Sequence, residues 1–213
     1  KFPPNGVFLD VGGGNGFVAE AIQNAGFDVA SLEPGRLGSS NAKNRGIKNV
    51  FNCTLQESGF KENSFGGVGV FDVVEHISDD QLFARELHRL LKPEGTVFMT
   101  VPTFRWLWSN EDVFAGHFRR YTVSSATKLL SDVGFDVVFS SYFFRPLVVP
   151  ILLLRSLPSL IGFRKSKDGD RACSEHSLPD SFVGRAMQFG LNRELLRIKK
   201  LNSTFLGSSC VLV

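Results

Sequence analysis

The sequence is poor in cysteine and carries no strong excess of charge. Its cysteines, Cys53, Cys173 and Cys210, are far apart and form none of the short spacings that bind zinc or build a disulfide framework. An odd number of scattered cysteines is typical of reduced thiols, so we expect a cytoplasmic protein. The formal net charge is only +3 and no basic stripe is concentrated anywhere, which argues against a nucleic-acid-binding protein.

Long hydrophobic runs, repeats and low-complexity tracts are also missing. The most apolar stretch, residues 142–163, is interrupted by prolines and arginines, and its uninterrupted part is too short to span a bilayer. No signal-peptide pattern is present. The chain starts without methionine almost on its first expected strand and stops on apolar residues. We therefore expect it to be trimmed at both ends.

The 213 residues are enough for one domain with a full core, and the hydrophobic content of 43% is ordinary for a globular protein. Short apolar runs alternate with helical patterns, which predicts a doubly wound α/β sheet. Strands are expected at residues 7–10, 28–32, 49–52, 67–71, 96–101, 136–141 and 204–213. Helices are expected after residue 16, from Ser78 and after Thr122. Residues 142–202 form an insertion before the last strand, and residues 182–201 within it are expected to form a basic amphipathic helix.

The most informative segment, residues 8–16, reads Phe-Leu-Asp-Val-Gly-Gly-Gly-Asn-Gly. An apolar run leads to Asp10, and glycines at alternate positions then precede a helical pattern. Glycines allow a ligand to approach the backbone closely, and the amides at a helix N-terminus attract negative charge. The dinucleotide-binding fingerprint would require a third glycine where this chain has Phe17.

The pattern Asp-x-Gly-x-Gly-x-Gly resembles motif I of the class I S-adenosylmethionine-dependent methyltransferases. The order of expected elements also resembles that fold, and the subgroup is similar to the type 11/12 methyltransferases of bacteria. The resemblance implies a mostly parallel, seven-stranded Rossmann-like sheet with an antiparallel last strand in a three-layer αβα arrangement. The whole chain, residues 1–213, would then be one methyltransferase domain. The helical lid that such enzymes carry before motif I has no counterpart in this sequence.

The resemblance also implies a set of cofactor-binding residues. The loop glycines would hold the cofactor carboxylate, Asp10 its ammonium group and Glu33 its ribose hydroxyls. Glu33 follows an expected strand, and a carboxylate at this place also serves dinucleotide folds, so it does not separate the two cofactors. An apolar slot for adenine is expected beside Thr54 and Leu55, although the family often has an acidic residue at the first position. The full set is Asp10, Gly12, Gly13, Gly14, Gly16, Glu33, Thr54, Leu55 and Phe71, with Phe71 facing the methionine portion.

A second motif, residues 71–77, reads Phe-Asp-Val-Val-Glu-His-Ile and resembles the Glu-His-Ile segment after strand four of many small-molecule methyltransferases. Residues at the carboxyl ends of strands line the ligand crevice of an open α/β sheet. Histidine is the natural base near neutral pH, so His76 is the first candidate base and His117 the second. The alternative is that His76 packs on the cofactor. The pair Glu75 and His76 would suit a metal, but no clear set of further ligands is visible, and we expect no metal site.

The expected acceptor-binding loop lies between residues 101 and 122 and contains both tryptophans of the chain. Aromatic side chains with convergent polar groups suit an acceptor pocket, and arginine suits carboxylate or phosphate. The candidates are Trp106, Trp108, Arg119, Arg120 and Tyr121. The alternative is that the tryptophans hold the loop in place while one arginine pairs with Asp112 or Glu111.

The apolar residues 142–163 admit three interpretations: a lid over the acceptor, a helix at a membrane surface, or a dimer contact. The sequence therefore predicts an S-adenosylmethionine-dependent methyltransferase that acts on a small molecule, such as a lipid or glycan precursor. A peripheral membrane contact through residues 142–163 is open. The rival functions are a non-catalytic cofactor-binding or membrane-associated partner protein and, disfavoured by Phe17 and Asp10, an NAD-dependent oxidoreductase.

Overall fold

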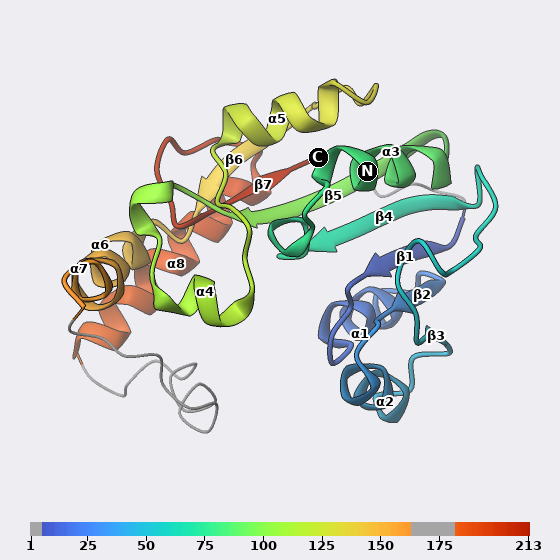
Figure 1. Ribbon diagram of the computed structural model, residues 1–213, viewed down its shortest axis with the longest axis horizontal. Helices are drawn as coiled ribbons and strands as arrows, with labels where there is room; N and C mark the ends of the chain where they lie inside the picture. The colour runs from blue at the N-terminus through green and yellow to red at the C-terminus, as the bar shows by residue number, and fades with distance from the viewer. Residues whose placement is uncertain (1–5, 163–181) are drawn as a thin grey trace.

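The computed structural model describes residues 6–162 and 182–213 and is built on a seven-stranded sheet of order β3-β2-β1-β4-β5-β7-β6 (Figure 1). Neighbouring strands from β3 to β5 are parallel, and β7 runs antiparallel to both β5 and β6. The prediction of a mostly parallel sheet with an antiparallel last strand is confirmed. The strands are β1 (Phe8–Val11), β2 (Val29–Leu32), β3 (Asn49–Phe51), β4 (Phe65–Phe71), β5 (Leu91–Pro102), β6 (Ser140–Phe143) and β7 (Ser209–Leu212).

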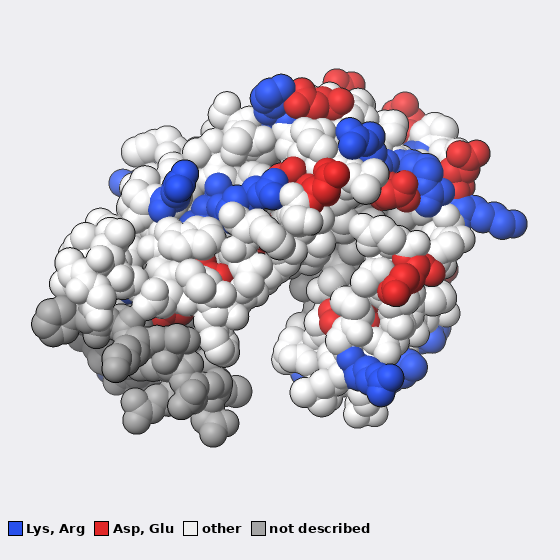
Figure 2. Space-filling view, viewed as in Figure 1, with Lys and Arg blue, Asp and Glu red and all other residues white. Residues whose placement is uncertain are grey.

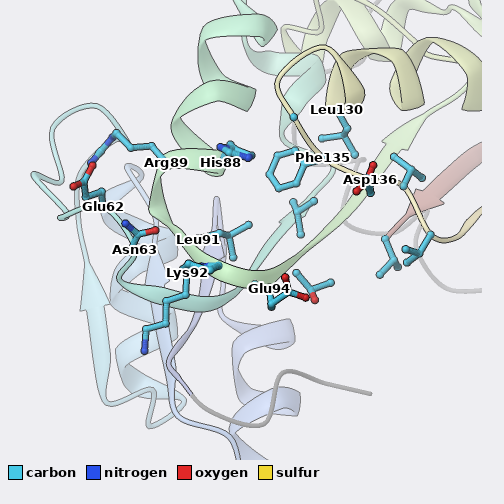
Figure 3. Close-up of a pocket in the computed structure, with 18 residues that line it drawn as sticks. Glu62, Asn63, His88, Arg89, Leu91, Lys92, Glu94, Leu130, Phe135 and Asp136 are labelled. Atoms are coloured by element: carbon cyan, nitrogen blue, oxygen red, sulfur yellow. The ribbon is translucent and has the colours of Figure 1, made fainter.

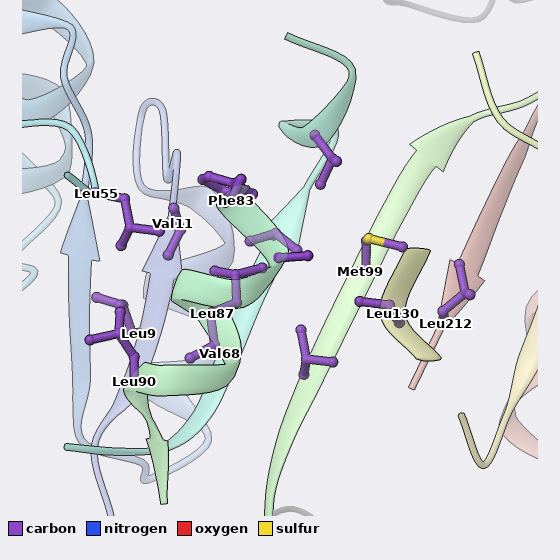
Figure 4. Packing of buried hydrophobic residues seen from close by; sticks show 14 of the residues in the cluster. Leu9, Val11, Leu55, Val68, Phe83, Leu87, Leu90, Met99, Leu130 and Leu212 are labelled. Carbon is purple, nitrogen blue, oxygen red and sulfur yellow. The ribbon is translucent and has the colours of Figure 1, made fainter. Parts of the chain in front are cut away.

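Helices cover both faces of this sheet, as the three-layer prediction requires (Figure 1). On one face, α1 (Phe17–Asn24) and α2 (Arg36–Asn44) bury Ala19 and Ala42 against Phe8. On the other face, α3 (Asp80–Leu90) and α5 (Val123–Ser131) pack over the centre of the sheet. Figure 4 shows Phe83, Leu87 and Leu90 of α3 against strand residues such as Leu9 and Val68. Strands that are covered on both sides read as continuous apolar runs, which is why the sequence revealed them.

The helix expected from Ser78 begins at Asp80 instead. The side chain of Asp79 accepts a hydrogen bond from the amide of Leu82 at 2.9 Å, so Asp79 caps the helix. The buried face of this helix is formed by Phe83, Leu87 and Leu90, whereas Leu82 is 45% exposed. The helix expected after Thr122 is confirmed, because the Thr122 side chain accepts from the amide of Ser125.

The expected loop at residues 103–121 contains regular structure: η2 (Arg105–Leu107) and α4 (Asn110–Ala115). Ser109 and Asp112 form a capping box at the start of α4, and Gly116 ends the helix with a φ of 74°. The turn η1 (Val74–His76) follows β4. These two connections lie at the carboxyl ends of β4 and β5, where an open α/β sheet binds its ligands.

Three strand predictions were placed wrongly. The strand expected at residues 96–101 is β5 at Leu91–Pro102, which begins five residues earlier and pairs Leu91 with Phe65. The strand expected at residues 136–141 is β6 at Ser140–Phe143, and the last strand is confined to Ser209–Leu212. Residues paired on β6 and β7 run from Ser140 opposite Leu212 to Phe143 opposite Ser209. Val138, whose β-branched side chain favours a strand, is 80% exposed and lies in the segment that precedes β6. The partner strand, and not local propensity, decided these limits.

The predicted insertion begins with a chain of short helical turns: η3 (Arg145–Leu147), α6 (Val148–Ile151), η4 (Leu152–Ser156) and α7 (Leu157–Leu160). The helix α8 (Phe182–Lys199) confirms that residues 182–201 are mainly helical, and it packs beside η3. An apolar buried face is not observed among its described side chains, because Leu195 and Leu196 are more than half exposed whereas Glu194 is buried. Residues 163–181 of the insertion lie outside the described part of the chain. Within the described residues, no helix combines the length and apolar character needed to cross a membrane.

Candidate active site

The glycine-rich loop joins β1 to α1 and is held against β2. The amides of Gly12 and Gly13 donate to the carbonyl of Leu32 at 2.7 and 3.2 Å. Gly12 has a φ of 70°, and a Cβ built on it would lie 2.5 Å from a methyl carbon of Val73. Gly16 precedes α1 with a φ of 82°. The loop therefore needs glycine both for its backbone conformation and for close packing.

Glu33, which follows β2, is hydrogen-bonded to this loop. Its carboxylate accepts hydrogen bonds from the amide of Gly14 at 2.9 Å and from the amide of Gly35 at 2.7 Å. Each carboxylate oxygen keeps a second lone pair for a further donor, such as a ribose hydroxyl. Glu33 and the glycine loop, both predicted to bind the cofactor, are therefore in direct contact.

Asp10 lies beneath the loop and is only 1% exposed. A Cβ built on Gly13 would lie 2.9 Å from Oδ2 of Asp10. This Oδ2 atom and Oγ of the buried Ser31 have no hydrogen-bond partner among the described residues. Burial raises the pKa of Asp10 to about 6, although the amide of Ala19 opposes the shift. A buried carboxyl oxygen without a partner fits the ammonium group of a bound amino-acid moiety.

A cavity of about 350 Å³ opens beside the loop and Glu33. This volume lies in the range of small-molecule sites. Its lining combines apolar side chains with the two carboxylates Glu33 and Asp72. The lining residues are Val11, Gly12, Leu32, Glu33, Pro34, Cys53, Thr54, Leu55, Gln56, Asp72, Val73, His76, Ile77 and Phe83.

The predicted adenine positions border this cavity, whereas Phe71 does not. Thr54 and Leu55 both line it, and Leu55 is 6% exposed. The Thr54 hydroxyl donates to Glu57 at 2.7 Å. The Phe71 ring packs over Gly69 and beside Phe8 on the face covered by α1 and α2. Contact between Phe71 and the methionine portion of a cofactor stays a prediction.

The structure brings the two candidate histidines together. The amide of Phe118 donates to the carbonyl of Glu75 at 2.7 Å and so ties the loop after β5 to the turn after β4. The rings of His76 and His117 meet edge to face with centroids 4.6 Å apart. The His76 ring also donates to the carbonyl of Ala115, and burial and the neighbouring His117 lower the pKa of His76. His76 borders the cavity, so this pair lies at the edge of the cofactor site.

Asp112 orients His117, a role that the sequence did not reveal. Oδ1 of Asp112 lies 2.8 Å from Nδ1 of His117, and Arg120 contacts both oxygens of the same carboxylate at 2.8 and 3.0 Å. Burial by itself would raise the pKa of Asp112, but the hydrogen bonds from His117 and Arg120 lower it to about 2. Since an ionised carboxylate only accepts, Nδ1 is the donor and Nε2 of a neutral His117 is free to accept. The sequence signal that could have drawn attention to Asp112 is the capping pattern that it forms with Ser109.

Glu75 completes the cluster. It is 1% exposed, and its Oε2 atom has no hydrogen-bond partner among the described residues. Burial raises the pKa of Glu75 to about 8. Ligand atoms of Glu75, His76 and His117 all lie within 4.8 Å of one another. The sequence alone did not predict that His117 lies beside Glu75 and His76.

The predicted acceptor residues divide into two groups. Trp106 is 47% exposed and stacks on Phe104 with centroids 5.2 Å apart, and Trp108 is half-buried nearby. Three others bind within the protein: Arg120 pairs with Asp112, while Arg119 and the Tyr121 hydroxyl contact Asp80 at 2.6 and 2.8 Å. These contacts give Arg119, Arg120 and Tyr121 a structural role in the loop. Their predicted role in acceptor binding stays a prediction.

The surface is hollowed at this place. Figure 2 shows a deep cleft between the part of the molecule that carries α1 and α2 and the part that carries α4. A larger cavity, of about 640 Å³, lies elsewhere, at the amino ends of β4 and β5 (Figure 3). His88, Arg89 and Glu94 are among the residues around it. Because ligands of open α/β sheets bind at the carboxyl ends of strands, we place the active site in the cleft beside the glycine loop.

Known proteins that resemble this chain in sequence and fold are methyltransferases. A sequence profile described as a methyltransferase domain matches residues 1–139. A probable S-adenosylmethionine-dependent methyltransferase of Mycobacterium tuberculosis is 27% identical over 142 residues, which is 65% of this chain and 52% of that protein. A ubiquinone biosynthesis O-methyltransferase of Rhizobium etli is 28% identical over 96 residues, 43% of this chain and 39% of that protein. The chain thus spans about half, or less, of the length of these relatives.

A solved structure of a SAM-dependent methyltransferase from Archaeoglobus fulgidus shares the fold, with a TM-score of 0.63 and 15% identity over 99% of this chain and 86% of that one. A phosphoethanolamine N-methyltransferase from Haemonchus contortus, in complex with S-adenosylmethionine, gives a TM-score of 0.58 and 18% identity over 99% of this chain and 49% of that one. The glycine loop, the unpartnered Asp10 and the cavity fit the same cofactor. The chain belongs to the methyltransferase-domain family, and its cofactor is S-adenosylmethionine.

Proposed function

We propose that the protein transfers the methyl group of S-adenosylmethionine to a hydroxyl group of a small molecule. The observation that carries this proposal is the contact between His76 and His117 at the border of the cofactor cavity, with His117 held by Asp112. A hydroxyl group is a poor nucleophile until its proton is removed or weakened. An oriented imidazole with a free nitrogen is the group that such an acceptor requires.

Bound S-adenosylmethionine supplies an already activated methyl group on its sulfonium, so the protein has mainly to align and desolvate the reactants. In this proposal Asp10 holds the ammonium group, the loop from Gly12 to Gly16 meets the carboxylate, and Glu33 accepts from the ribose. Leu55 lies in the apolar part of the cavity, where adenine would bind. Nε2 of His117 accepts the proton of the acceptor hydroxyl as the methyl group moves.

The names of relatives support an oxygen acceptor. Several relatives are ubiquinone biosynthesis O-methyltransferases, with 28% and 31% identity to this chain for the Rhizobium etli and Escherichia fergusonii proteins. The alignments cover 43% of this chain in both cases, and 39% and 41% of the two relatives. We therefore propose only the acceptor class, a small hydroxylated molecule.

Incubation with radiolabelled S-adenosylmethionine and a panel of small phenols, alcohols, amines and carboxylic acids tests this proposal. We expect label to enter hydroxyl compounds, and we expect His117→Ala to reduce this transfer without changing the affinity for S-adenosylhomocysteine. His88→Ala is the matched control, because His88 lies on α3 beside Phe135, away from the cleft. Transfer to amines alone would contradict the proposal. Cofactor binding without transfer to any member of the panel would favour the non-catalytic alternative.

We also propose that the acceptor is apolar and is reached at a lipid surface. The segment from α6 to α7 exposes large apolar side chains, and α8 beside it carries basic residues, a combination that suits an anionic membrane surface. The exposed apolar residues are Val149, Leu153, Leu154, Leu157, Leu160 and Ile161, and the basic residues are Arg185, Arg193, Arg197, Lys199 and Lys200. Figure 1 shows α6 and α7 beside α8 at one end of the molecule.

Sedimentation with vesicles tests this second proposal. We expect the protein to bind vesicles that contain anionic lipid and to bind neutral ones less, because the basic residues add electrostatic attraction. The combined substitution Val149→Ser, Leu160→Ser and Ile161→Ser should reduce the bound fraction, whereas Val138→Ser, an exposed apolar residue outside this segment, should not. Equal binding by both variants would contradict a lipid contact here.

A further inference from the structure

The turn after β4 and the loop after β5 bring three metal-ligating side chains to one point. A carboxylate oxygen of Glu75 and ring nitrogens of His76 and His117 lie within 4.8 Å of one another. Because ligand atoms lie about 2.0–2.2 Å from such an ion, small side-chain movements would bring all three into contact with one ion. The hydrogen bond from the amide of Phe118 to the carbonyl of Glu75 fixes the two connections relative to each other.

Both imidazoles are already oriented by their second nitrogen. Nδ1 of His117 bonds the ionised Asp112 at 2.8 Å, and the His76 ring donates to the carbonyl of Ala115. Histidines that bind metals almost always use their other ring nitrogen in this way, with a carboxylate or a backbone carbonyl as the acceptor. One nitrogen of each ring is therefore left for a ligand.

Glu75 supplies an independent indication. Glu75 is 1% exposed, and its Oε2 atom has no hydrogen-bond partner among the described residues. Leaving a buried polar atom without a partner costs free energy, and burying a charge without one costs more. A cation in contact with Oε2 would supply the missing partner. None of the other described side chains is placed to do so by a hydrogen bond.

We propose that Glu75, His76 and His117 form a binding site for one divalent transition-metal ion at the edge of the cofactor cavity. Two imidazoles and one carboxylate suit Mn²⁺, Fe²⁺, Co²⁺ or Zn²⁺ better than Mg²⁺ or Ca²⁺, which prefer oxygen ligands. Because the protein offers three ligands, further positions on the ion stay open to a small molecule. His76 reaches both this site and the cavity, so the ion would lie beside the place where methyl transfer is proposed.

This inference rests on the proposed function in one respect, namely the role of the ion. A hydroxyl group bound to a divalent ion loses its proton more readily, since the ion stabilises the resulting anion. With the ion bound, the ion would take over from Nε2 of His117 the task of activating the acceptor hydroxyl. His76 and His117 would then hold the ion, which replaces the role of base proposed above for His117. Binding of the ion itself does not depend on which acceptor is used.

Titration of the full chain with Co²⁺ tests the site directly. The protein, free of any affinity tag, is treated with EDTA and dialysed, and Co²⁺ binding is followed by visible absorption and by calorimetry. We expect one ion per chain. His117→Ala and His76→Ala should each weaken binding at least about tenfold, the scale seen for metal-site substitutions. His88→Ala is the control and should leave the affinity unchanged.

Folding of each variant is checked by its circular dichroism spectrum and by a cooperative thermal unfolding transition. The His76→Ala variant is the decisive one, because His76 is exposed and its removal leaves the core intact. Absence of a one-to-one Co²⁺ complex, or equal affinity in His76→Ala and the parent, would overturn the proposed site.

The methyl-transfer assay separates this inference from the proposed function. Tight Co²⁺ binding together with no transfer to hydroxyl compounds would leave the site in place and remove the proposed function. Transfer to hydroxyl compounds that EDTA does not reduce would confirm the function and overturn the role of the ion. We expect EDTA to suppress transfer and added Mn²⁺, Co²⁺ or Zn²⁺ to restore it.

Discussion

The buried carboxylate of Asp112 lies 2.8 Å from Nδ1 of His117 and determines which nitrogen of that imidazole faces the cleft. Asp112 is held in turn by Arg120 and by the amide of Ser109. A helix cap, an ion pair and a candidate catalytic histidine therefore share one carboxylate. The sequence analysis offered Asp112 only as a possible partner of an arginine, and the structure adds its contact with His117.

Replacing Asp112 should destabilise the protein strongly. In Asp112→Ala the guanidinium of Arg120, whose side chain is only 10% exposed, loses both of its carboxylate contacts. Breaking a buried pair by removing one partner costs about 3–5 kcal/mol. Urea unfolding measures the loss. The control Asp132→Ala breaks an exposed pair with Lys128 and should cost at most about 1 kcal/mol. Similar small losses in both variants would show that the Asp112 cluster does not stabilise the fold.

Removing Glu33 should weaken cofactor binding. Glu33→Ala deletes a carboxylate that holds the amide of Gly14 and is positioned for the ribose hydroxyls. Hydrogen bonds to a charged group contribute about 1.5–3 kcal/mol, so calorimetry with S-adenosylhomocysteine should show a loss of that size. Glu86→Ala, which removes a surface partner of Arg89, serves as the control. An unchanged dissociation constant in Glu33→Ala would rule out Glu33 as the ribose ligand.

A methyl group added at Gly12 should lower both the stability and the cofactor affinity, whereas one added at Gly26 should lower the stability alone. Gly12 and Gly26 both have positive φ, 70° and 93°, but only at Gly12 would a Cβ collide with a neighbour, at 2.5 Å from Val73. An L side chain in the left-handed region costs about 1–2 kcal/mol, so both alanine variants should lose stability. Because Val73 lines the cavity, only Gly12→Ala should also lose affinity for S-adenosylhomocysteine. Thermal unfolding and calorimetry on the two variants check this, and equal affinities would place the cofactor away from Gly12.

The affinity for the cofactor should fall in mildly acidic solution. Burial raises the pKa of Asp10 from 3.8 to about 6, and only the ionised form attracts an ammonium group. As the pH falls below about 6, binding of S-adenosylhomocysteine should weaken by up to about tenfold per pH unit. Calorimetry between about pH 5 and about pH 8 measures the effect. Asp10→Asn should bind weakly with no pH dependence over this range, and a variant that kept the parent's pH profile would assign the titration to another group.

The same carboxyl makes an opposite contribution to folding. A raised pKa means that the folded protein binds the proton more tightly than the unfolded chain does. This stabilisation is present in full below the unfolded pKa of 3.8 and is lost as the pH rises through about 6. The unliganded Asp10→Asn variant should therefore lose this part of the pH dependence when unfolding is followed by urea titration.

Much of the fold could be predicted from local patterns. The strands β1, β2 and β4 and the second half of β5 are short apolar runs, and the glycine-rich segment predicted the turn between β1 and α1. The positions of Glu33 and His76 at strand ends followed from the same alternation. These features depend on neighbours along the chain, because hydrophobic periodicity and turn chemistry act over a few residues.

The tertiary structure decided the rest. The limits of β6 are set by its pairing with β7, a strand that the whole insertion separates from β6 in the sequence. Arg119 and Tyr121 meet at Asp80, and Arg120 turns to Asp112, so residues that read as an acceptor cluster hold the loop in place. His117 joins Glu75 and His76 only because two separate connections meet at the carboxyl edge of the sheet. Ion pairs and shared ligand sites form between residues that are distant in sequence. Packing of the elements therefore determines which oppositely charged or ligating groups meet. The free-energy cost of burying such groups unpaired favours the arrangements in which they find partners. Local sequence patterns do not contain this information.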